Sequence, residues 1–270
     1  MPEIRLSRGK IYYETHGKGE PLVGLHHGMS SIRAWKNQIE AFGRHFTFIT
    51  YDRLGDGRSE RHLTHEEGYF ENRASELGEL ITHLGLDSVH LCGMCEGGAI
   101  ALVFAASWPK KVNTLICQGV GYYTTDETIA RCEEHFQPWS ELDVTLRHQL
   151  IRHHGQDYAM LKWEALREAK PYVWDPSYDL RPRFSRVEAS TLIIAGDKDQ
   201  FFDMEQAVAA NDGIKNSRLR IMPETGHFPN ERAPAVFNKV ALDFLKRQAF
   251  ACSPKDRQLR QERTVAGRHE

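Results

Sequence analysis

The residue that stands out for its chemistry in this sequence is Cys95, which lies in the segment CGMCEGGA, residues 92–99. An apolar run before it, residues 89–92, indicates a buried strand, and residues 99–106 after it indicate a helix. Flanking glycines let strand and helix approach closely, and the turn requires a strained backbone with positive φ at Cys95. The sulfur would then lie at a helix N-terminus, which stabilises a thiolate, so Cys95 is a candidate nucleophile. The alternative is an inert cysteine buried in a glycine-rich turn.

Two further motifs each follow an expected strand, and together they supply a base and an acid. His227 stands in ETGHFP, residues 224–229, and can serve as general base for a thiol or form an imidazolium–thiolate pair. Asp199 stands in AGDKD, residues 195–199, and a carboxylate on the far nitrogen of His227 would fix its tautomer. Asp197 is the alternative acid, and the position within the loop favours Asp199.

Backbone N–H groups near the expected nucleophile predict an oxyanion hole. Met29 follows His27-Gly28 at the end of a strand, and its N–H and that of Glu96 can point at one developing negative charge. The side chain of Glu96 has two interpretations: it complements the dipole of the helix that it begins, or it tunes Cys95 or His227. The turn-rich loop 51–59 is predicted to be scaffolding beside the oxyanion loop.

The alternation of apolar strands and amphipathic helices predicts an α/β protein with a parallel sheet covered on both faces. Residues 4–7 and 10–14 flank Arg8-Gly9 and predict a hairpin. Later strands are expected at 21–26, 46–51, 89–92, 112–117, 191–195 and 218–222. Helices are expected at 31–42, 71–84, 99–106 and 233–247. The motifs described above then lie at strand ends, where open α/β sheets bind ligands.

The alternation of expected strands and helices stops between residues 122 and 186, where no apolar strand is expected. We place the expected domain boundaries at this interruption. We expect a first core part at 1–121, a helical cap at 122–186 over the carboxyl edge of the sheet, a second core part at 187–250, and a charged, disordered tail at 251–270. The cap region is rich in aromatic residues. A substrate pocket is therefore predicted from the following residues: His27, Tyr122, Trp139, Trp163 and Phe228.

The composition of the chain argues against several classes of function. The formal net charge of the 270 residues is −2, which argues against nucleic-acid partners and anionic membranes. No apolar stretch is long enough to span a bilayer and no secretory signal is visible, so a cytoplasmic location is expected. The five cysteines are odd in number, and the Cys92-x-x-Cys95 pair lacks further ligands for a metal. We expect no metal and no organic cofactor. The oligomeric state is left open.

Taken in order, these motifs resemble the α/β-hydrolase superfamily, in its lactonase, esterase, haloperoxidase-like and C–C hydrolase branch. The resemblance covers residues 3–248. It rests on the lead-in IYYETHGKGEP, the His27-Gly28 loop, the loop 52–59, the turn around Cys95, Gly196…Asp199 and Gly226-His227…Pro229. It implies a mostly parallel sheet of about eight strands with helices on both faces and a small helical cap. It also implies a triad of Cys95, Asp199 and His227, with Cys95 at the so-called nucleophile elbow.

The cysteine departs from the serine that most members of this superfamily carry, although Gly93-x-Cys95-x-Gly97-Gly98-Ala99 is similar to dienelactone hydrolases, which also use cysteine. The expected activity is covalent acyl catalysis that hydrolyses an ester, lactone or thioester of a small molecule. One alternative is a non-hydrolytic acyltransferase or a Dieckmann-type cyclase or thioesterase that releases an acyl chain from a carrier protein. An alternative of another class is a non-catalytic ligand-binding protein of the same fold. An engineered replacement of serine by Cys95 is also left open.

Overall fold

The computed structural model describes residues 2–63, 67–170 and 174–251, and it is built around one eight-stranded sheet. The strands, in chain order, are β1 (Glu3–Leu6), β2 (Gly9–His16), β3 (Pro21–Leu25), β4 (Thr47–Asp52), β5 (Val89–Met94), β6 (Val112–Gln118), β7 (Ser190–Gly196) and β8 (Ser217–Met222). Their order in the sheet is β1-β2-β4-β3-β5-β6-β7-β8. Only β2 runs against its neighbours β1 and β4, and the other pairs are parallel. The expected mostly parallel sheet and the N-terminal hairpin are confirmed.

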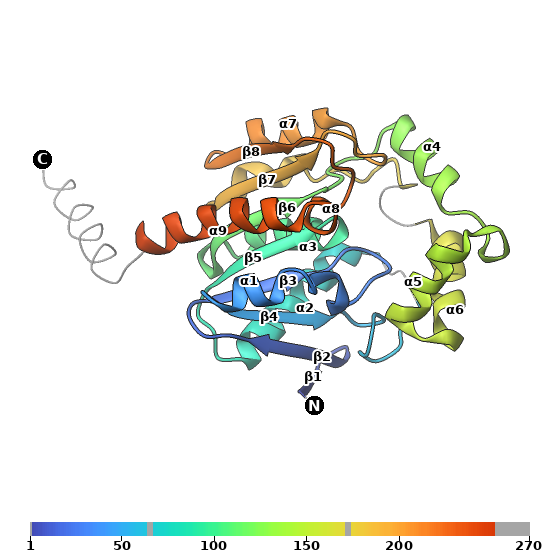
Figure 1. Ribbon diagram of the computed structural model, residues 1–270, viewed down its shortest axis with the longest axis horizontal. Coiled ribbons are helices and arrows are strands. Elements are labelled where there is room, and N and C mark those ends of the chain that lie inside the picture. Colours follow the sequence, from blue (N-terminus) through green and yellow to red (C-terminus); the bar gives the residue numbers. More distant parts are fainter. Residues whose placement is uncertain (1, 64–66, 171–173, 252–270) are drawn as a thin grey trace, which may run out of the picture.

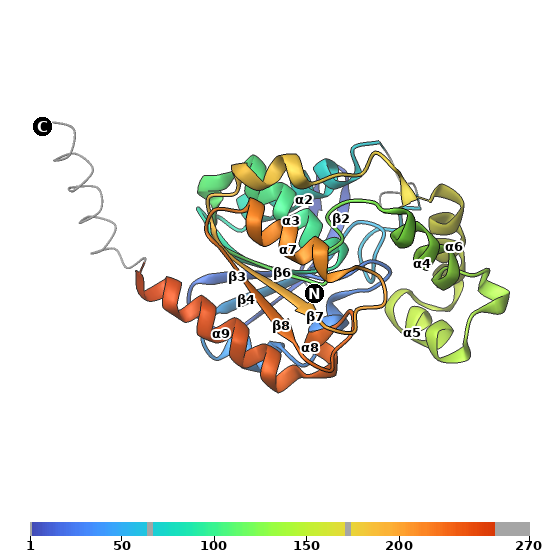
Figure 2. The same cartoon turned by 90° about the horizontal axis from the view of Figure 1, so that it is seen from above.

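Helices cover both faces of the sheet, as Figure 2 shows. One face carries α2 (Tyr69–His83), α3 (Glu96–Ser107) and α7 (Met204–Gly213). The other face carries α1 (Ile39–Gly43), α8 (Pro229–Arg232) and α9 (Pro234–Ala251). Each layer buries its own apolar cluster against the sheet. This two-sided burial explains why the central strands read as continuous apolar runs rather than as alternating ones.

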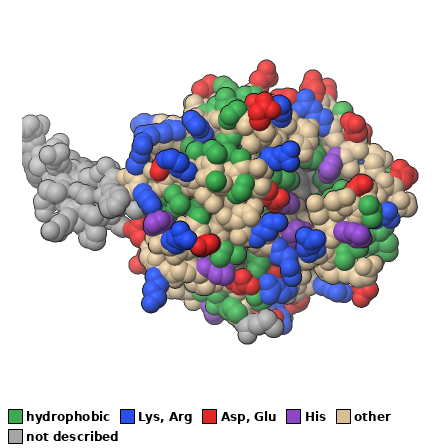
Figure 3. Space-filling view, in the orientation of Figure 1, with side chains coloured by type: hydrophobic (Ala, Val, Ile, Leu, Met, Phe, Trp, Pro, Cys, Tyr) green, Lys and Arg blue, Asp and Glu red, His purple; other side chains and the backbone are tan. Residues whose placement is uncertain are grey.

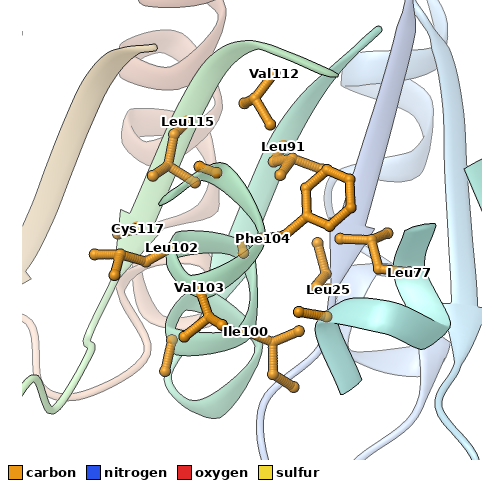
Figure 4. Packing of buried hydrophobic residues seen from close by; sticks show 14 of the residues in the cluster. Leu25, Leu77, Leu91, Ile100, Leu102, Val103, Phe104, Val112, Leu115 and Cys117 are labelled. Carbon is orange, nitrogen blue, oxygen red and sulfur yellow. The ribbon is translucent and has the colours of Figure 1, made fainter. Parts of the chain in front are cut away.

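The centre of the larger cluster is α3, which has no polar face. Every residue from Gly97 to Ala106 is buried, so the helix is surrounded by protein on all sides. Figure 4 shows Ile100, Val103 and Phe104 packed among side chains of β3, β5, β6 and α2. A helix that is embedded in this way cannot shift easily, and its first residue therefore provides a rigid platform beside Cys95.

Most of the segment between β6 and β7 is helical and lies beyond the carboxyl ends of the parallel strands (Figure 1). The helices there are α4 (Asp126–His135), η3 (Trp139–Glu141), α5 (Val144–His154) and α6 (Gln156–Ala169). The last helix of the segment, η5 (Arg181–Arg186), packs instead on α3 and α7 at one face of the sheet, because its Phe184 is buried in the main core. A further short helix, η2 (Pro109–Lys111), precedes β6. Lys162 of α6 forms an ion pair with buried Asp56 at 3.0 Å, which ties these helices to the sheet. The division of the chain at residues 121, 186 and 250 stays a prediction.

The helix expected at residues 31–42 is divided into two in the structure, and nearly all of the expected tail lies outside the residues that the structure describes. Residues 31–42 form a short helix, η1 (Ile32–Trp35), a turn, and then α1. The N–H of Gln38 bonds the carbonyl of Trp35, three residues back, which is the tighter 3₁₀ winding. The spacing of apolar residues predicted a single helix because one continuous helix would bury Ile32, Trp35 and Phe42 on one face. The two short helices bury the same three residues. Apart from Ala251, the predicted tail at 251–270 lies outside the described residues.

Candidate active site

Cys95 lies at the sharp turn between β5 and α3, with φ of 50° and ψ of −121°. Its N–H donates to the carbonyl of Gln118 at the end of β6, at 2.8 Å. A Cβ at Gly97 would lie 2.4 Å from the carbonyl oxygen of Leu25 in β3, so only glycine permits this approach of helix and sheet. The positive φ and the close packing are the features expected of the turn from its glycines.

His227 and Asp199 are in direct contact. Nδ1 of His227 lies 2.9 Å from Oδ2 of Asp199, and both side chains are buried. The other carboxylate oxygen of Asp199 accepts hydrogen bonds from the N–H groups of Phe201 and Phe202. Asp197, the alternative acid, accepts instead from the N–H of Thr225 at 3.3 Å. Of the two candidates, Asp199 is therefore the one that holds the imidazole.

The imidazole of His227 lies beside Cys95 in the lining of one cavity, and the two side chains interact electrostatically. Burial lowers the pKa of His227, but the negative charges of Cys95 and Asp199 outweigh burial and raise the pKa well above 6.5. Burial raises the pKa of Asp199, yet the charge and hydrogen bond of His227 and two backbone N–H groups bring it below its ordinary value. These directions favour a charged imidazolium beside an ionised Asp199 carboxylate.

A cavity of about 680 Å³ opens onto Cys95 and His227. Of the residues predicted for the pocket, His27, Trp163 and Phe228 line it, and so do Met29 and Glu96. Met29 has a φ of 54°, which is strained for a residue with a side chain. Its N–H and that of Glu96, the first residue of α3, are the two predicted oxyanion donors; the first N–H groups of a helix have no partner within it.

Two predicted pocket residues lie elsewhere. The ring of Tyr122 packs edge-on against Phe184 at 5.5 Å in the main core, where β6 has just ended. Trp139 belongs to the short helix η3 and packs against Trp163 and its neighbours, away from the cavity lining. Both are aromatic residues used for packing, and composition alone did not separate such residues from those that face a ligand.

The comparison with known proteins addresses which family has this arrangement. Residues 23–240 match the model of the alpha/beta hydrolase family, which is most of the chain. The chain belongs to this family.

Relatives of this hydrolase-family protein cover nearly its whole length. It is 30% identical over 256 residues to a human protein named serine hydrolase BPHL, covering 90% of this chain and 86% of the relative. It is 25% identical to 2-hydroxy-6-oxo-6-phenylhexa-2,4-dienoate hydrolase of Comamonas testosteroni, covering 92% of this chain and 95% of that one. Among solved structures, an enol-lactonase from Burkholderia xenovorans LB400 superposes with a TM-score of 0.76 at 18% identity. That match covers 91% of this chain and 100% of the other, and it shows the same fold.

In this alpha/beta hydrolase, the carboxylate of Glu96 turns away from His227. It lies 3.1 Å from the guanidinium of Arg53 and accepts a hydrogen bond from the hydroxyl of Tyr69 at 2.6 Å. Arg53 is itself fully buried and donates to the carbonyl oxygens of His26 and His27. Glu96 therefore neutralises the arginine that holds the His26-His27 loop, a role that the sequence did not suggest, and it also lies in the first turn of α3, as the helix-dipole interpretation requires. The scaffolding role expected of the loop 51–59 agrees with these bonds.

Sequence reasoning missed two aromatic side chains beside the imidazole. The rings of Phe201 and Phe202 lie 4.9 and 5.3 Å from that of His227, and both line the cavity. They follow Asp199 directly, so their place after the acid was the available signal. Helix α4 adds Cys132 and His135 to the lining. Phe201 and Phe202 thus give the cavity an aromatic wall beside His227.

Cationic side chains also line the cavity, and they come from η1, α5 and the loops after η1 and β4. These lining residues are Arg33, Lys36, Arg58 and Arg152. Figure 3 shows several Lys and Arg side chains on the face drawn there. Arg58 forms an ion pair with Glu14 at 3.0 Å, whereas Arg33 and Arg152 have no acidic partner within 4.0 Å among the described residues. This part of the cavity is suited to a negatively charged group.

Proposed function

We propose that this alpha/beta hydrolase is a cysteine-dependent acyl hydrolase that acts on an ester, lactone or thioester carbonyl. The observation that carries the proposal is that Cys95 and His227 line one cavity while the imidazole of His227 is bonded to Asp199. A nucleophile within hydrogen-bond reach of a base, with the base oriented by an acid, is the arrangement that covalent acyl catalysis requires.

In the acylation step, the thiolate of Cys95 attacks the carbonyl carbon and the carbonyl oxygen becomes negatively charged. The N–H groups of Met29 and Glu96 donate hydrogen bonds to that oxygen. When the intermediate collapses, the bond to the leaving group breaks, and the imidazolium of His227 gives its proton to the departing oxygen or sulfur. The products of this step are the released alcohol or thiol and an acyl thioester on Cys95.

In the deacylation step, water attacks the thioester while neutral His227 takes one of its protons. Collapse of the second intermediate breaks the carbon–sulfur bond and returns the thiolate, so the carboxylic acid leaves and the imidazolium–thiolate pair is restored. Asp199 remains ionised throughout and stabilises the imidazolium through the 2.9 Å contact with Nδ1.

The cysteine narrows the substrates to activated carbonyls. One relative is named a serine hydrolase, and this chain has a thiol at the position we assign to the nucleophile. A thiolate attacks esters and thioesters at neutral pH but is also a good leaving group, so amides are poor substrates. The thioester intermediate stays reactive toward nucleophiles other than water. An acyltransferase or cyclase acting on a carrier-protein thioester is therefore the second candidate.

The lining of the cavity supports an acyl group with an apolar body and a negative charge. Phe136, Trp163 and Phe201 supply aromatic surface, and Arg33 and Arg152 supply charge. The name of the Comamonas testosteroni relative describes a substrate with a phenyl group and a carboxylate. We propose a small-molecule carboxylate of this general build.

Two single variants test the proposal. Cys95→Ala should abolish hydrolysis of an aryl ester, whereas Cys92→Ala removes a thiol that is buried in β5, outside the cavity, and should leave kcat within about twofold. Product analysis then separates the candidates, because free acid indicates hydrolysis and a ring or transferred acyl group indicates the second candidate. Full activity in Cys95→Ala would contradict both the hydrolase and the acyltransferase or cyclase. Ligand binding without turnover would favour a binding protein.

A further inference from the structure

Three fully buried amide side chains lie between the sheet and the helices α1, α8 and α9, outside the cavity described above. They are Gln38, Gln118 and Asn230, each with 0% of its surface exposed. Burying an amide is unfavourable unless each polar group finds a partner. The bonds of such a cluster can fix the relative position of the segments that they join, which matters where those segments carry functional residues.

Gln118 and Asn230 are joined by two hydrogen bonds. Nε2 of Gln118 donates to Oδ1 of Asn230 at 2.8 Å, and the backbone N–H of Asn230 donates to Oε1 of Gln118 at 3.0 Å. Two bonds between the same pair fix direction as well as distance. The end of β6 is therefore held rigidly against α8.

These two residues also adjoin the two reacting side chains. The carbonyl of Gln118 accepts the N–H of Cys95 at 2.8 Å, and Asn230 follows His227 by three residues. A Cβ at Gly119 would lie 2.5 Å from the carbonyl oxygen of His227, so the end of β6 also touches the histidine loop directly. One residue, Gln118, thus bonds the turn of Cys95 through its backbone and the loop of His227 through its side chain.

We propose that Gln118 is a positioning residue that sets the separation of Cys95 and His227. The inference rests on the proposed function only in taking those two side chains as the reacting pair. The two residues lie 132 positions apart in the chain, on loops that are joined through Gln118 and Asn230 and the contact at Gly119. A displacement of about 1 Å between reacting groups can reduce a rate by about 10²-fold.

Gln118→Met tests the proposal, because methionine has similar length and lacks both polar atoms. We expect kcat for an aryl ester to fall by about 10- to 100-fold with KM changed by less than about threefold. The alkaline limb of the pH profile should also move to lower pH, because a looser contact with Cys95 stabilises the imidazolium less.

The matched control is Gln38→Met. Gln38 is equally buried and donates to the carbonyl of the same Asn230 at 3.0 Å, but none of its described hydrogen bonds reaches the turn of Cys95. Both variants should therefore lose similar stability in urea, and only Gln118→Met should lose most of its kcat. Equal losses of kcat in the two variants would overturn the proposal and leave Gln118 a purely structural residue.

An NMR titration of His227 keeps this test independent of turnover. The proposal predicts a lower pKa of His227 in Gln118→Met than in Gln38→Met, whether or not the enzyme forms an acyl intermediate. Identical titrations in the two variants would overturn the positioning role, whereas failure of Cys95 to become acylated would overturn the proposed function alone.

Discussion

Asp199 accepts a hydrogen bond from Nδ1 of His227 at 2.9 Å, and neither side chain has appreciable contact with solvent. The carboxylate thereby occupies Nδ1 and leaves Nε2 as the ring nitrogen available for the proposed exchange of a proton. In a buried setting its negative charge also favours the protonated imidazole. The contact therefore controls both the orientation and the charge of the proposed base.

Asp199→Asn should lower kcat/KM for an aryl ester by about 10²- to 10⁴-fold, because an amide does not stabilise the imidazolium. The sign of the pH effect follows from the raised pKa of His227. The imidazolium needed for acylation is present at low pH and is lost as pH rises through that pKa. Removing the charge lowers the pKa, so the alkaline limb should move to lower pH. A pH–rate profile with an unmoved alkaline limb would show that Asp199 does not act through His227.

Glu96→Gln should affect stability more than activity. The substitution removes the charge that faces buried Arg53 at 3.1 Å and leaves the backbone N–H of residue 96 in place. We expect the free energy of unfolding to fall by about 3 kcal/mol, since Asp56 still lies beside Arg53, and kcat to change by less than about tenfold. Urea unfolding measures the first quantity and steady-state kinetics the second.

Glu40→Gln is the matched control for that experiment. Glu40 forms an ion pair with Arg44 on an exposed helix surface, where such pairs contribute at most about 1 kcal/mol. Equal destabilisation by the two variants would mean that Glu96 and Arg53 do not form the buried pair seen in the structure.

Replacing Arg33 and Arg152 together with glutamine should change selectivity for charge. The p-nitrophenyl esters of butyric acid and of succinic acid form a matched pair that differs by one carboxylate. We expect kcat/KM for the succinyl ester to fall by about tenfold, which is about 1.4 kcal/mol, with the butyryl ester unchanged within about twofold. High salt should reduce the difference in the wild-type enzyme because these side chains are exposed. An equal loss for both esters would exclude a charge-specific role.

Much of this architecture could be predicted from the sequence because its signals are local. The glycines around Cys95 fix a turn that few other residues permit, and the order of Cys95, Asp199 and His227 along the chain placed each at a strand end. The sheet followed from apolar runs such as those of β5 and β7. Each of these signals lies within about ten residues, which is the range over which hydrophobic pattern and turn chemistry operate.

Features that depend on packing between distant segments were not predicted. Glu96 lies in the first turn of α3, as expected for a residue that complements the helix dipole, but its ion pair with Arg53, 43 residues earlier, could not be predicted from local sequence. Tyr122 follows β6 closely and turned into the core instead of the cavity. Gln118 and Asn230 looked like ordinary polar residues in the sequence, and only the fold brings their amides together.

The most direct test of the account is to find the acyl group on the enzyme. Wild-type protein turning over p-nitrophenyl butyrate is quenched in acid, digested and examined by mass spectrometry. The account predicts a butyryl thioester on the peptide that contains Cys95, its absence in Cys95→Ala, and its retention in Cys92→Ala. Ester hydrolysis that continues at the wild-type rate with no acyl group on Cys95 would contradict the account.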